Sequence, residues 1–231
     1  MLIANNNLYS CGKKSRYQTG IEKFSNKESN SLLKVNLNDQ FNNKILQDNE
    51  FIVDVSTGHY HSLILTNKGK VYSIGNNKFG QLGVSDNITH YSKHFIQLVF
   101  EKDNVFITSI KCGYYHNLFL DSEGFVYTNG CNLLGQINGV QDSIIEYVSS
   151  TNKLDFNEKA VKIYCSNYKN CVQLESGKHV FWGGRLYKKE YSLKNLPKII
   201  GFNVYEKEEG LEGKKIIDVS LGLYHEMILV E

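Results

Sequence analysis

The sequence predicts an all-β protein folded as a β-propeller of about four blades, either a small closed ring or a partial ring. Three observations lead to this fold class. A pattern of glycine, histidine and apolar residues recurs at intervals of about 55 residues, as in repeat architectures. Each copy reads as short apolar strands separated by glycine-containing turns. No copy can bury both of its faces alone, so the copies are expected to stack radially.

Copies of the pattern cover most of the chain. The clearest is FIVDVSTGHYHSLILTNKGKVYSIGNNKFGQLG, and a second full copy contains SIKCGYYHNLFLDSEGFVYTNGCNLLGQING. A weaker copy contains KIYCSNYKNCVQLESGKHVFWGG, and the half copies DVSLGLYHEMILVE and LYSCGKKSRYQTG complement each other. The approximate bounds are 51–83, 105–139, 160–184 and a split copy made of 215–231 and 1–20. We therefore expect residues 1–231 to form a single domain.

Two kinds of strand alternate with tight turns in each copy. In the first strand, Val53 and Val55, or Val161 and Ile163, flank a polar residue, which indicates a strand with one buried face. The second strand is apolar at consecutive positions, as in LIL, and this is typical of a strand covered on both faces. The turns TNKG, DSEG and LESG lead to a third strand. Outer strands are expected between the copies, in the segments LLKVNL, HFIQLVF and IIEYV.

The repeated polar positions are interpreted as structural. A histidine follows the turn glycine in three copies, with Lys169 in the weak copy, and we expect each histidine to hydrogen-bond nearby backbone. A glutamine beside glycine follows the third strand, and its side chain is expected to lock that turn. The positions expected to fix the repeat are Gly12, Gln18, Gly20, Gly58, His61, Gly75, Gly80, Gln81, Gly83, Gly113, His116, Gly130, Gly135, Gln136, Gly183, Gly222 and His225.

Composition narrows the class of protein. A net charge of +2 predicts no strong field for nucleic acid or anionic membranes. No apolar stretch reaches the roughly 20 residues of a membrane span, and MLIANNN has no features of a secretory signal. Five cysteines without C-x-x-C spacing are interpreted as reduced core thiols, with Cys112 and Cys165 in one repeat column. These features favour a cytoplasmic or nuclear protein.

We find no catalytic constellation, no metal site and no cofactor motif in the sequence. His59 lies two residues from His61, but the latter belongs to the repeat. His90 and His94 lack the accompanying glutamate of a zinc protease helix. The glycine-rich turns lack the helix start or Lys-Ser/Thr continuation of a phosphate loop. The basic cluster KKSR in the half copy at residues 8–20 is interpreted as a solvated surface, with contact to a phosphate or an acidic partner as the alternative.

The long pattern of these copies resembles the repeat of the regulator-of-chromosome-condensation family. The copy at 51–83 contains Gly58, His61, Gly75 and Gln81 in the spacing of that repeat, and the copy at 105–139 keeps most of them. The resemblance implies a propeller of four-stranded blades, normally seven, whose last blade is shared by strands from both termini. It also implies a binding role, because members of that family act as exchange factors for a Ran-type GTPase, dock on chromatin or serve as adaptors. The third copy departs from the pattern, with Ser166 and Lys169 in place of glycine and histidine and no glutamine turn.

Closure and function follow from these expectations. Pairing the terminal half copies would remove two exposed sheet edges, which favours a ring closed by the chain itself, and an arc completed by another chain is the alternative. The leading function is a non-catalytic protein-interaction scaffold. The alternative is a guanine-nucleotide exchange factor or chromatin-associated regulator of a Ran-type GTPase. A contact with nucleic acid is only weakly suggested, and binding loops are expected in the insertions at 21–50 and 185–214.

Overall fold

The computed structural model describes residues 1–21, 28–37, 44–84, 90–100, 104–138, 147–184, 203–204, 215–222 and 226–231. These residues form β-strands and turns, with no helix among them, so the predicted all-β class is confirmed. In the described part of the chain, consequently, no helix is long and apolar enough to cross a membrane.

The strands form antiparallel sheets that follow the repeat. The first sheet contains β1 (Leu2–Ala4), β2 (Asn7–Lys13) and β3 (Glu28–Lys34). The second contains β4 (Ile52–Thr57), β5 (His61–Thr66), β6 (Val71–Asn76) and β7 (Tyr91–Gln97). The third contains β8 (Ile107–Cys112), β9 (His116–Asp121), β10 (Val126–Cys131) and β11 (Tyr147–Leu154). The fourth contains β12 (Ala160–Cys165), β13 (Lys169–Leu174), β14 (His179–Gly183) and β15 (Asn203–Val204), and β16 (Ile216–Leu221) pairs with β17 (Glu226–Val230).

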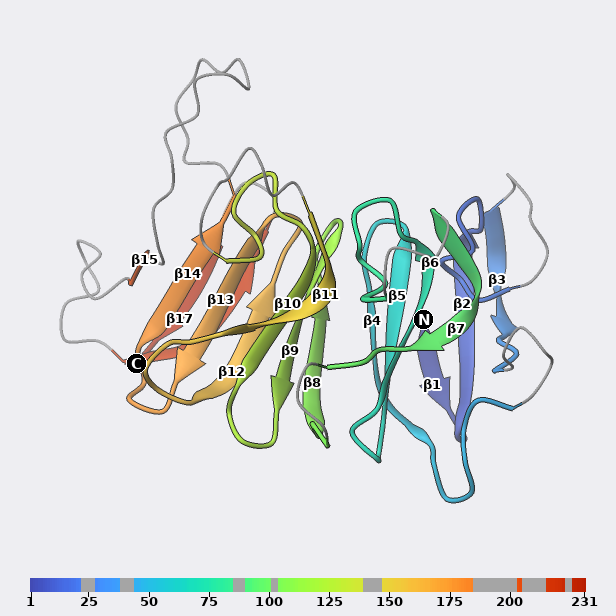
Figure 1. The fold of residues 1–231 in the computed structure, drawn as a ribbon, viewed down its shortest axis with the longest axis horizontal. Helices are drawn as coiled ribbons and strands as arrows, with labels where there is room; N and C mark the ends of the chain where they lie inside the picture. The colour runs from blue at the N-terminus through green and yellow to red at the C-terminus, as the bar shows by residue number, and fades with distance from the viewer. Residues whose placement is uncertain are drawn as a thin grey trace, which may run out of the picture.

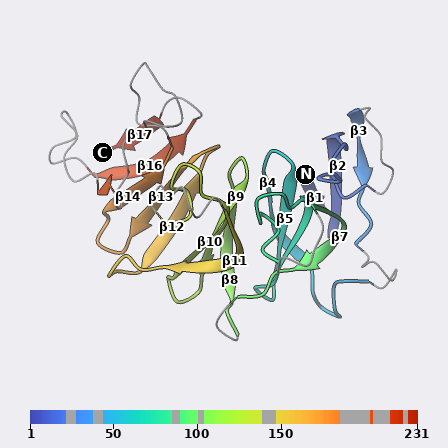
Figure 2. The ribbon, with the colours of Figure 1, turned by 45° about the horizontal axis from the view of Figure 1, so that its top comes forward.

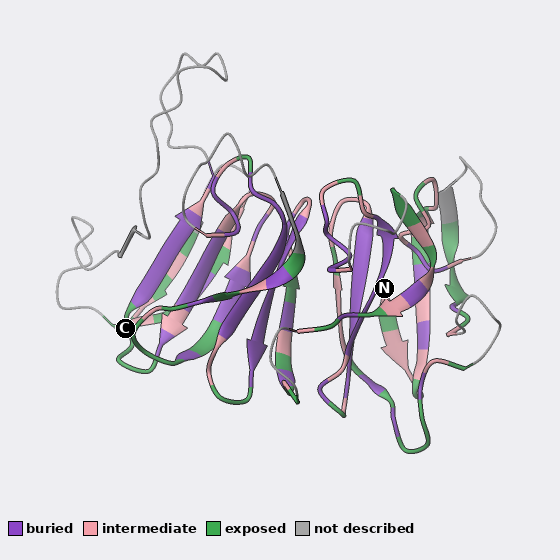
Figure 3. Cartoon of the chain, viewed as in Figure 1, coloured by how far each residue is buried: buried purple, intermediate pink, exposed green. Residues whose placement is uncertain are grey.

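The sheets stand side by side in a row, like consecutive blades of a propeller (Figures 1 and 2). Strand β1 contacts β4, and the first strands of the later sheets contact one another in the order β4, β8, β12 and β16. The middle strands β5, β6, β9 and β10 are buried along their whole length, which matches their apolar sequence (Figure 3). The core therefore consists of layers between neighbouring sheets.

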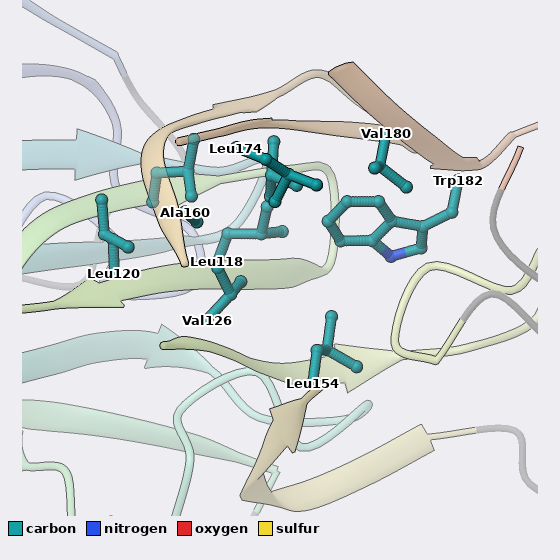
Figure 4. Close-up of a cluster of buried hydrophobic side chains, with 10 residues drawn as sticks. Leu118, Leu120, Val126, Leu154, Ala160, Leu174, Val180 and Trp182 are labelled. Atoms are coloured by element: carbon teal, nitrogen blue, oxygen red, sulfur yellow. The ribbon is translucent and has the colours of Figure 1, made fainter. Parts of the chain in front are cut away.

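One such layer joins the third and fourth sheets. Leu118, Leu120 and Val126 from β9 and β10 pack against Ala160 at the start of β12 and Trp182 on β14, together with several other aliphatic side chains (Figure 4). Equivalent clusters join the second sheet to the third and the first sheet to the second. Because each layer takes side chains from two sheets, a single sheet has no core of its own.

A bulge in the first strand of each later sheet corrects the sequence interpretation of that strand. The pairing register shifts between Ile52 and Asp54 in β4, and at the matching places in β8, β12 and β16. Val53 and Val161, which were expected to face the core, are exposed, whereas Ile52 and Ala160 before the bulge are buried. An inserted residue reverses the alternation of inward and outward side chains, and the residue types alone do not reveal it.

The ends of the row differ from the expected shared blade. Strands β16 and β17 pair with each other, while β1, β2 and β3 form a separate sheet, and no pairing joins the two sheets within the described residues. The two sheets lie at opposite ends of the row in both views (Figures 1 and 2). The partial ring is therefore the observed arrangement. The physical reason is that so few blades would each have to turn about twice as far as the blades of a seven-bladed ring.

The segments between copies are partly described. The expected outer strands in the first three insertions correspond to β3, β7 and β11. Most of the insertion at 185–214 lies outside the described residues.

Candidate functional site

The repeated histidines join neighbouring sheets. The Nε2 atom of His61 on β5 hydrogen-bonds the Oδ1 atom of Asn117 on β9, at 2.7 Å, and His116 does the same with Asn170 on β13, at 2.8 Å. The expected partner was backbone, so the structure corrects this interpretation: the partner is an amide side chain of the next sheet. Burial lowers the pKa of both imidazoles to about 4, so they are neutral at physiological pH.

The same amides close a bridge back to the glutamine turns. Asn117 donates from Nδ2 to the backbone carbonyl of Gln81 at 2.7 Å, and Asn170 donates to the carbonyl of Gln136 at 2.8 Å. Between the first and second sheets, Ser62 stands where Asn117 and Asn170 stand in the later sheets, and its hydroxyl donates to the backbone carbonyl of Gln18 at 2.6 Å. These junctions use the same geometry, so the repeat encodes the contact between blades.

The glutamine side chains bond within their own turns. The backbone N–H of Phe79 donates to Oε1 of Gln81 at 2.8 Å, and the N–H of Leu134 donates to Oε1 of Gln136 at the same distance. Gln18 accepts from the N–H of its own turn at 2.9 Å. These side chains are thus engaged in holding the turn.

Gly75 needs both a positive φ and close approach. Its φ is +112°, and an added Cβ would overlap the carbonyl oxygen of Tyr60. Gly130 has the same relation to Tyr115 in the next sheet. The third strand can therefore reach the preceding turn only because this position lacks a side chain.

Reactive chemistry is not assembled within the described residues. They contain no group of three or more metal-ligand side chains, and the five cysteines are free thiols. Burial raises the pKa of the Cys112 thiol to about 12, which keeps it protonated and unreactive. His225 lies outside the described residues, and Gly222 lies at their edge after β16.

A strip of aromatic side chains crosses the turns that precede the histidine positions. We call this set the aromatic strip, and its members are His59, Tyr60, Phe79, Tyr114, Tyr115 and Tyr168. All of them are partly exposed. The strip spans the β4–β5, β8–β9 and β12–β13 turns and takes Phe79 from the glutamine turn after β6, so it crosses three sheets.

Ring contacts make the aromatic strip continuous. The His59 ring stacks on Tyr60 at 3.9 Å between centroids and meets Tyr114 edge-on at 4.0 Å. Tyr114 stacks on Tyr168 at 5.3 Å, and Phe79 lies 5.0 Å from Tyr115. The separations of the Tyr114–Tyr168 and Phe79–Tyr115 pairs are typical of favourable aromatic pairs. Side chains from three successive repeats thus form one partly exposed surface.

Backbone hydrogen bonds fix the turns that carry the strip. The N–H of His59 donates to the carbonyl of Tyr114 at 3.2 Å, and the N–H of Tyr114 donates to the carbonyl of Asn167 at 2.9 Å. Each turn is thereby tied to the next. The strip is preformed and does not require the loops to rearrange.

The charges beside the strip are positive. Lys78 places its Nζ atom 5.6 Å from the centre of the Phe79 ring. Burial lowers the pKa of His59, and the nearby charge of Lys13 lowers it further, so this imidazole is neutral at physiological pH. Burial also raises the pKa of the Tyr115 phenol, with the neighbouring Tyr114 contributing. The strip is a neutral aromatic surface with lysines beside it.

The sequence contained a signal for the strip that the repeat comparison missed. A tyrosine stands immediately before the histidine position in every copy, in GHYH, GYYH, SNYK and GLYH. It persists in the third copy, where the histidine itself is replaced by Lys169. The asparagine partners were also missed, because the column that follows the histidine position varies between serine, asparagine and glutamate.

Known proteins with similar sequences contain the same type of repeat. The family model described as Regulator of chromosome condensation (RCC1) repeat matches residues 52–81 and 107–136, and a second model of the same description matches residues 68–120. The Ultraviolet-B receptor UVR8 of Arabidopsis thaliana is 30% identical over 151 residues, which cover 63% of this chain and 33% of that protein. The human RCC1-like G exchanging factor-like protein is 37% identical over 87 residues, covering 37% of this chain and 18% of its own length.

Solved structures show the same fold. Human WBSCR16 superimposes with a TM-score of 0.74 at 22% identity, covering 96% of this chain and 54% of its own. Prp20p of Saccharomyces cerevisiae, a protein with binding properties to Gsp1p and histones, superimposes with a TM-score of 0.68 at 20% identity, covering 93% of this chain and 49% of its own. The chain thus spans about half the length of these structures, and the matches with the two sequence relatives cover a third or less of those proteins.

Proposed function

We propose, from the premise that this chain is built of regulator of chromosome condensation repeats, that it is a non-catalytic platform for protein partners and that the aromatic strip is its binding surface. The observation that supports the proposal is that partly exposed rings from three repeats are joined into one preformed surface. In this proposal, residues 1–231 form one domain.

The chemistry of the strip fits a protein partner. Tyrosine and phenylalanine are enriched in the centres of protein interfaces, because they bury large rigid area at low entropic cost. The backbone bonds between turns reduce the ordering cost of binding further. Lys13 and Lys78 flank the rings and would attract an acidic rim on the partner. The five free cysteines support a reducing compartment, the cytoplasm or the nucleus.

The test compares capture of cellular proteins by three forms of the full chain. The first is wild type, the second carries Tyr114→Ser and Tyr168→Ser in the strip, and the control carries Tyr91→Ser on β7, outside it. We expect at least one protein that wild type and control capture equally and the strip variant loses. A strip variant that captures the same proteins in the same amounts as wild type contradicts the assignment of the surface.

A second candidate function is nucleotide exchange on a Ran-type GTPase. The sequence likeness to the human exchanging-factor-like protein and the structural likeness to Prp20p support it. Exchange needs no covalent chemistry from the chain, only a surface that distorts the nucleotide site. Release of labelled GDP from a Ran-type GTPase, measured with and without the chain, separates the two candidates. A many-fold increase in the rate of GDP release favours exchange, and an unchanged rate favours the platform function.

A further inference from the structure

Among the described residues, the last sheet carries apolar side chains that no neighbouring sheet covers. Met227 and Leu229 on β17 are 67% and 59% exposed. Their counterparts in the second sheet, Leu63 and Leu65, are 0% and 2% exposed, because they pack against the next sheet of the row. β17 thus presents the side chains of an interface between sheets, but the other half of the interface is missing.

Within the described residues, the first sheet lacks the strand that would match. In the complete sheets, the third-strand glycine lies against the carbonyl oxygen of the residue before the histidine position, as Gly75 does against Tyr60. Gly12 on β2 has a similar φ, +103° against +112° at Gly75, yet a Cβ there would meet nothing within 4 Å. The backbone of β2 therefore has the conformation that receives a full second strand, and in the part of the chain that the structure describes only the short β1 pairs with that edge.

Strand β1 fills only part of the empty place. It pairs with β2 from Leu2 opposite Tyr9 to Ala4 opposite Asn7, and leaves the stretch from Ser10 to Lys13 uncovered on that edge. In the same register, β5 pairs with β6 from Leu65 opposite Val71 to His61 opposite Gly75, which leaves only the last residue of β6 without an opposite partner. The three residues of β1 are a partial substitute for a strand like β17.

β17 cannot reach β2 of its own molecule in this structure. The two strands belong to sheets at opposite ends of the row, with the complete sheets between them (Figures 1 and 2). Strand β17 and the open edge of β2 are nevertheless the two parts of a sheet that the repeat forms in full elsewhere in the chain, as β5 and β6 do. Contact of this kind between different surfaces joins molecules head to tail.

We propose that the β16–β17 pair of a second copy of this chain completes the β2–β3 sheet, with β17 of one copy antiparallel to β2 of the other. The register of β5 and β6 places Met227 opposite Ser10 and Leu229 opposite Leu8, so Leu229 replaces Ile3 of β1. Met227 and Leu229 then cover the β4–β7 sheet, as Leu63 and Leu65 cover the β8–β11 sheet. Two copies that exchange these strands reciprocally close a ring of roughly eight blades, within the usual range for propellers.

The first test measures oligomeric state by sedimentation across a range of concentrations. Wild type is expected to form a dimer, and Gly12→Ala to weaken it at least tenfold, because the added Cβ meets the incoming carbonyl. Gly177→Ala is the matched control, since Gly177 also has a positive φ, +85°, and open space around it, but lies in the β13–β14 turn. A wild type that stays monomeric, or equal dimerisation of the two variants, overturns the proposal.

The second test traps the strand pairing covalently. Cys11 is exposed on β2, and in the proposed register it lies opposite residue 226 of the other copy. Directly opposed residues have Cα separations that a disulfide can bridge. Glu226→Cys is expected to give a dimer-sized, reducible band under oxidation, and this band should vanish with Cys11→Ser. A monomer-sized crosslink would show closure within one molecule and overturn the proposal, as would the absence of any crosslink through Cys11.

Discussion

The amide of Asn117 holds two sheets together, and its removal is the most direct test of how the repeat is stabilised. Its side chain bonds the imidazole of His61, the carbonyl of Gln81 and Oδ1 of Asn129, each at 2.7 Å and all within fully buried residues. Asn117→Ala removes these bonds at once. It leaves a buried donor and two buried acceptors without partners.

The expected cost follows from those unsatisfied groups. A buried polar group without a partner costs about 1–3 kcal/mol, so three such groups, partly relieved by entering water, predict a loss of about 3–6 kcal/mol in unfolding free energy. Since a domain of ordinary stability has about 5–15 kcal/mol in total, Asn117→Ala should remove a large fraction of it. The corresponding fall in melting temperature is roughly 6–24 °C for a chain of this size.

The assay is denaturant unfolding followed by tyrosine and tryptophan fluorescence. The control is Asn7→Ala, because Asn7 makes one local bond, to the carbonyl of Asn5 at 2.8 Å, near the surface. The control should change the unfolding free energy by less than about 1 kcal/mol. His61→Ala introduced into Asn117→Ala should cost less than it does in wild type, since the bond is already lost. If Asn117→Ala unfolds like the Asn7 control, the bridge does not stabilise the sheet contact.

Three further outcomes follow from described contacts. Gly75→Val should lower the melting temperature strongly, because a branched side chain overlaps the preceding turn at a positive φ, and an unchanged value would contradict the turn geometry. His61 and His116 have pKa values of about 4 in the folded chain and 6.5 in the unfolded chain, so the unfolded chain binds their protons first as the pH falls. The unfolding free energy should therefore be full above pH 6.5 and fall toward pH 4, by up to about 3 kcal/mol for each histidine. A flat pH profile would refute their burial as neutral rings. Lys162→Ala should leave the melting temperature unchanged, because its 2.7 Å bond to Asp218 is exposed to solvent, and a large drop would show that the bond holds the last sheet.

The sequence predicts the repeated residues well and their partners poorly. The glycine, histidine and glutamine columns are visible because the same residue types recur at one spacing, and the turns they form have the same geometry in successive sheets. The bridge of His61 could not be predicted in the same way. Its partner is Asn117, 56 residues away and in a column where the first copy has Ser62. Only the packing of adjacent sheets brings the two side chains together.

The remaining differences arise from backbone geometry. The bulge at Val53 and its counterparts changes the register of a strand without requiring any particular residue type, so alternation alone placed these side chains on the wrong face. The arrangement of the sheets in a row also depends on backbone geometry, since it results from the tilt between each pair of neighbouring sheets. The aromatic strip was within reach of the sequence, because Tyr60, Tyr115 and Tyr168 occupy one column, but their joining into a single surface is a property of the fold.

The replacement of a histidine by Lys169 has a consequence for how the molecule opens. The imidazole–amide bridges couple the second sheet to the third and the third to the fourth, whereas β16–β17 is joined by the small cluster around Tyr164 and Val219 and by the exposed Lys162–Asp218 pair. In a linear array, each junction sets how far unfolding spreads before it stops. The amides of β16 and β17 should therefore exchange with deuterated solvent through a local opening of their own, while those of β5, β6, β9 and β10 exchange together through the opening of the whole array.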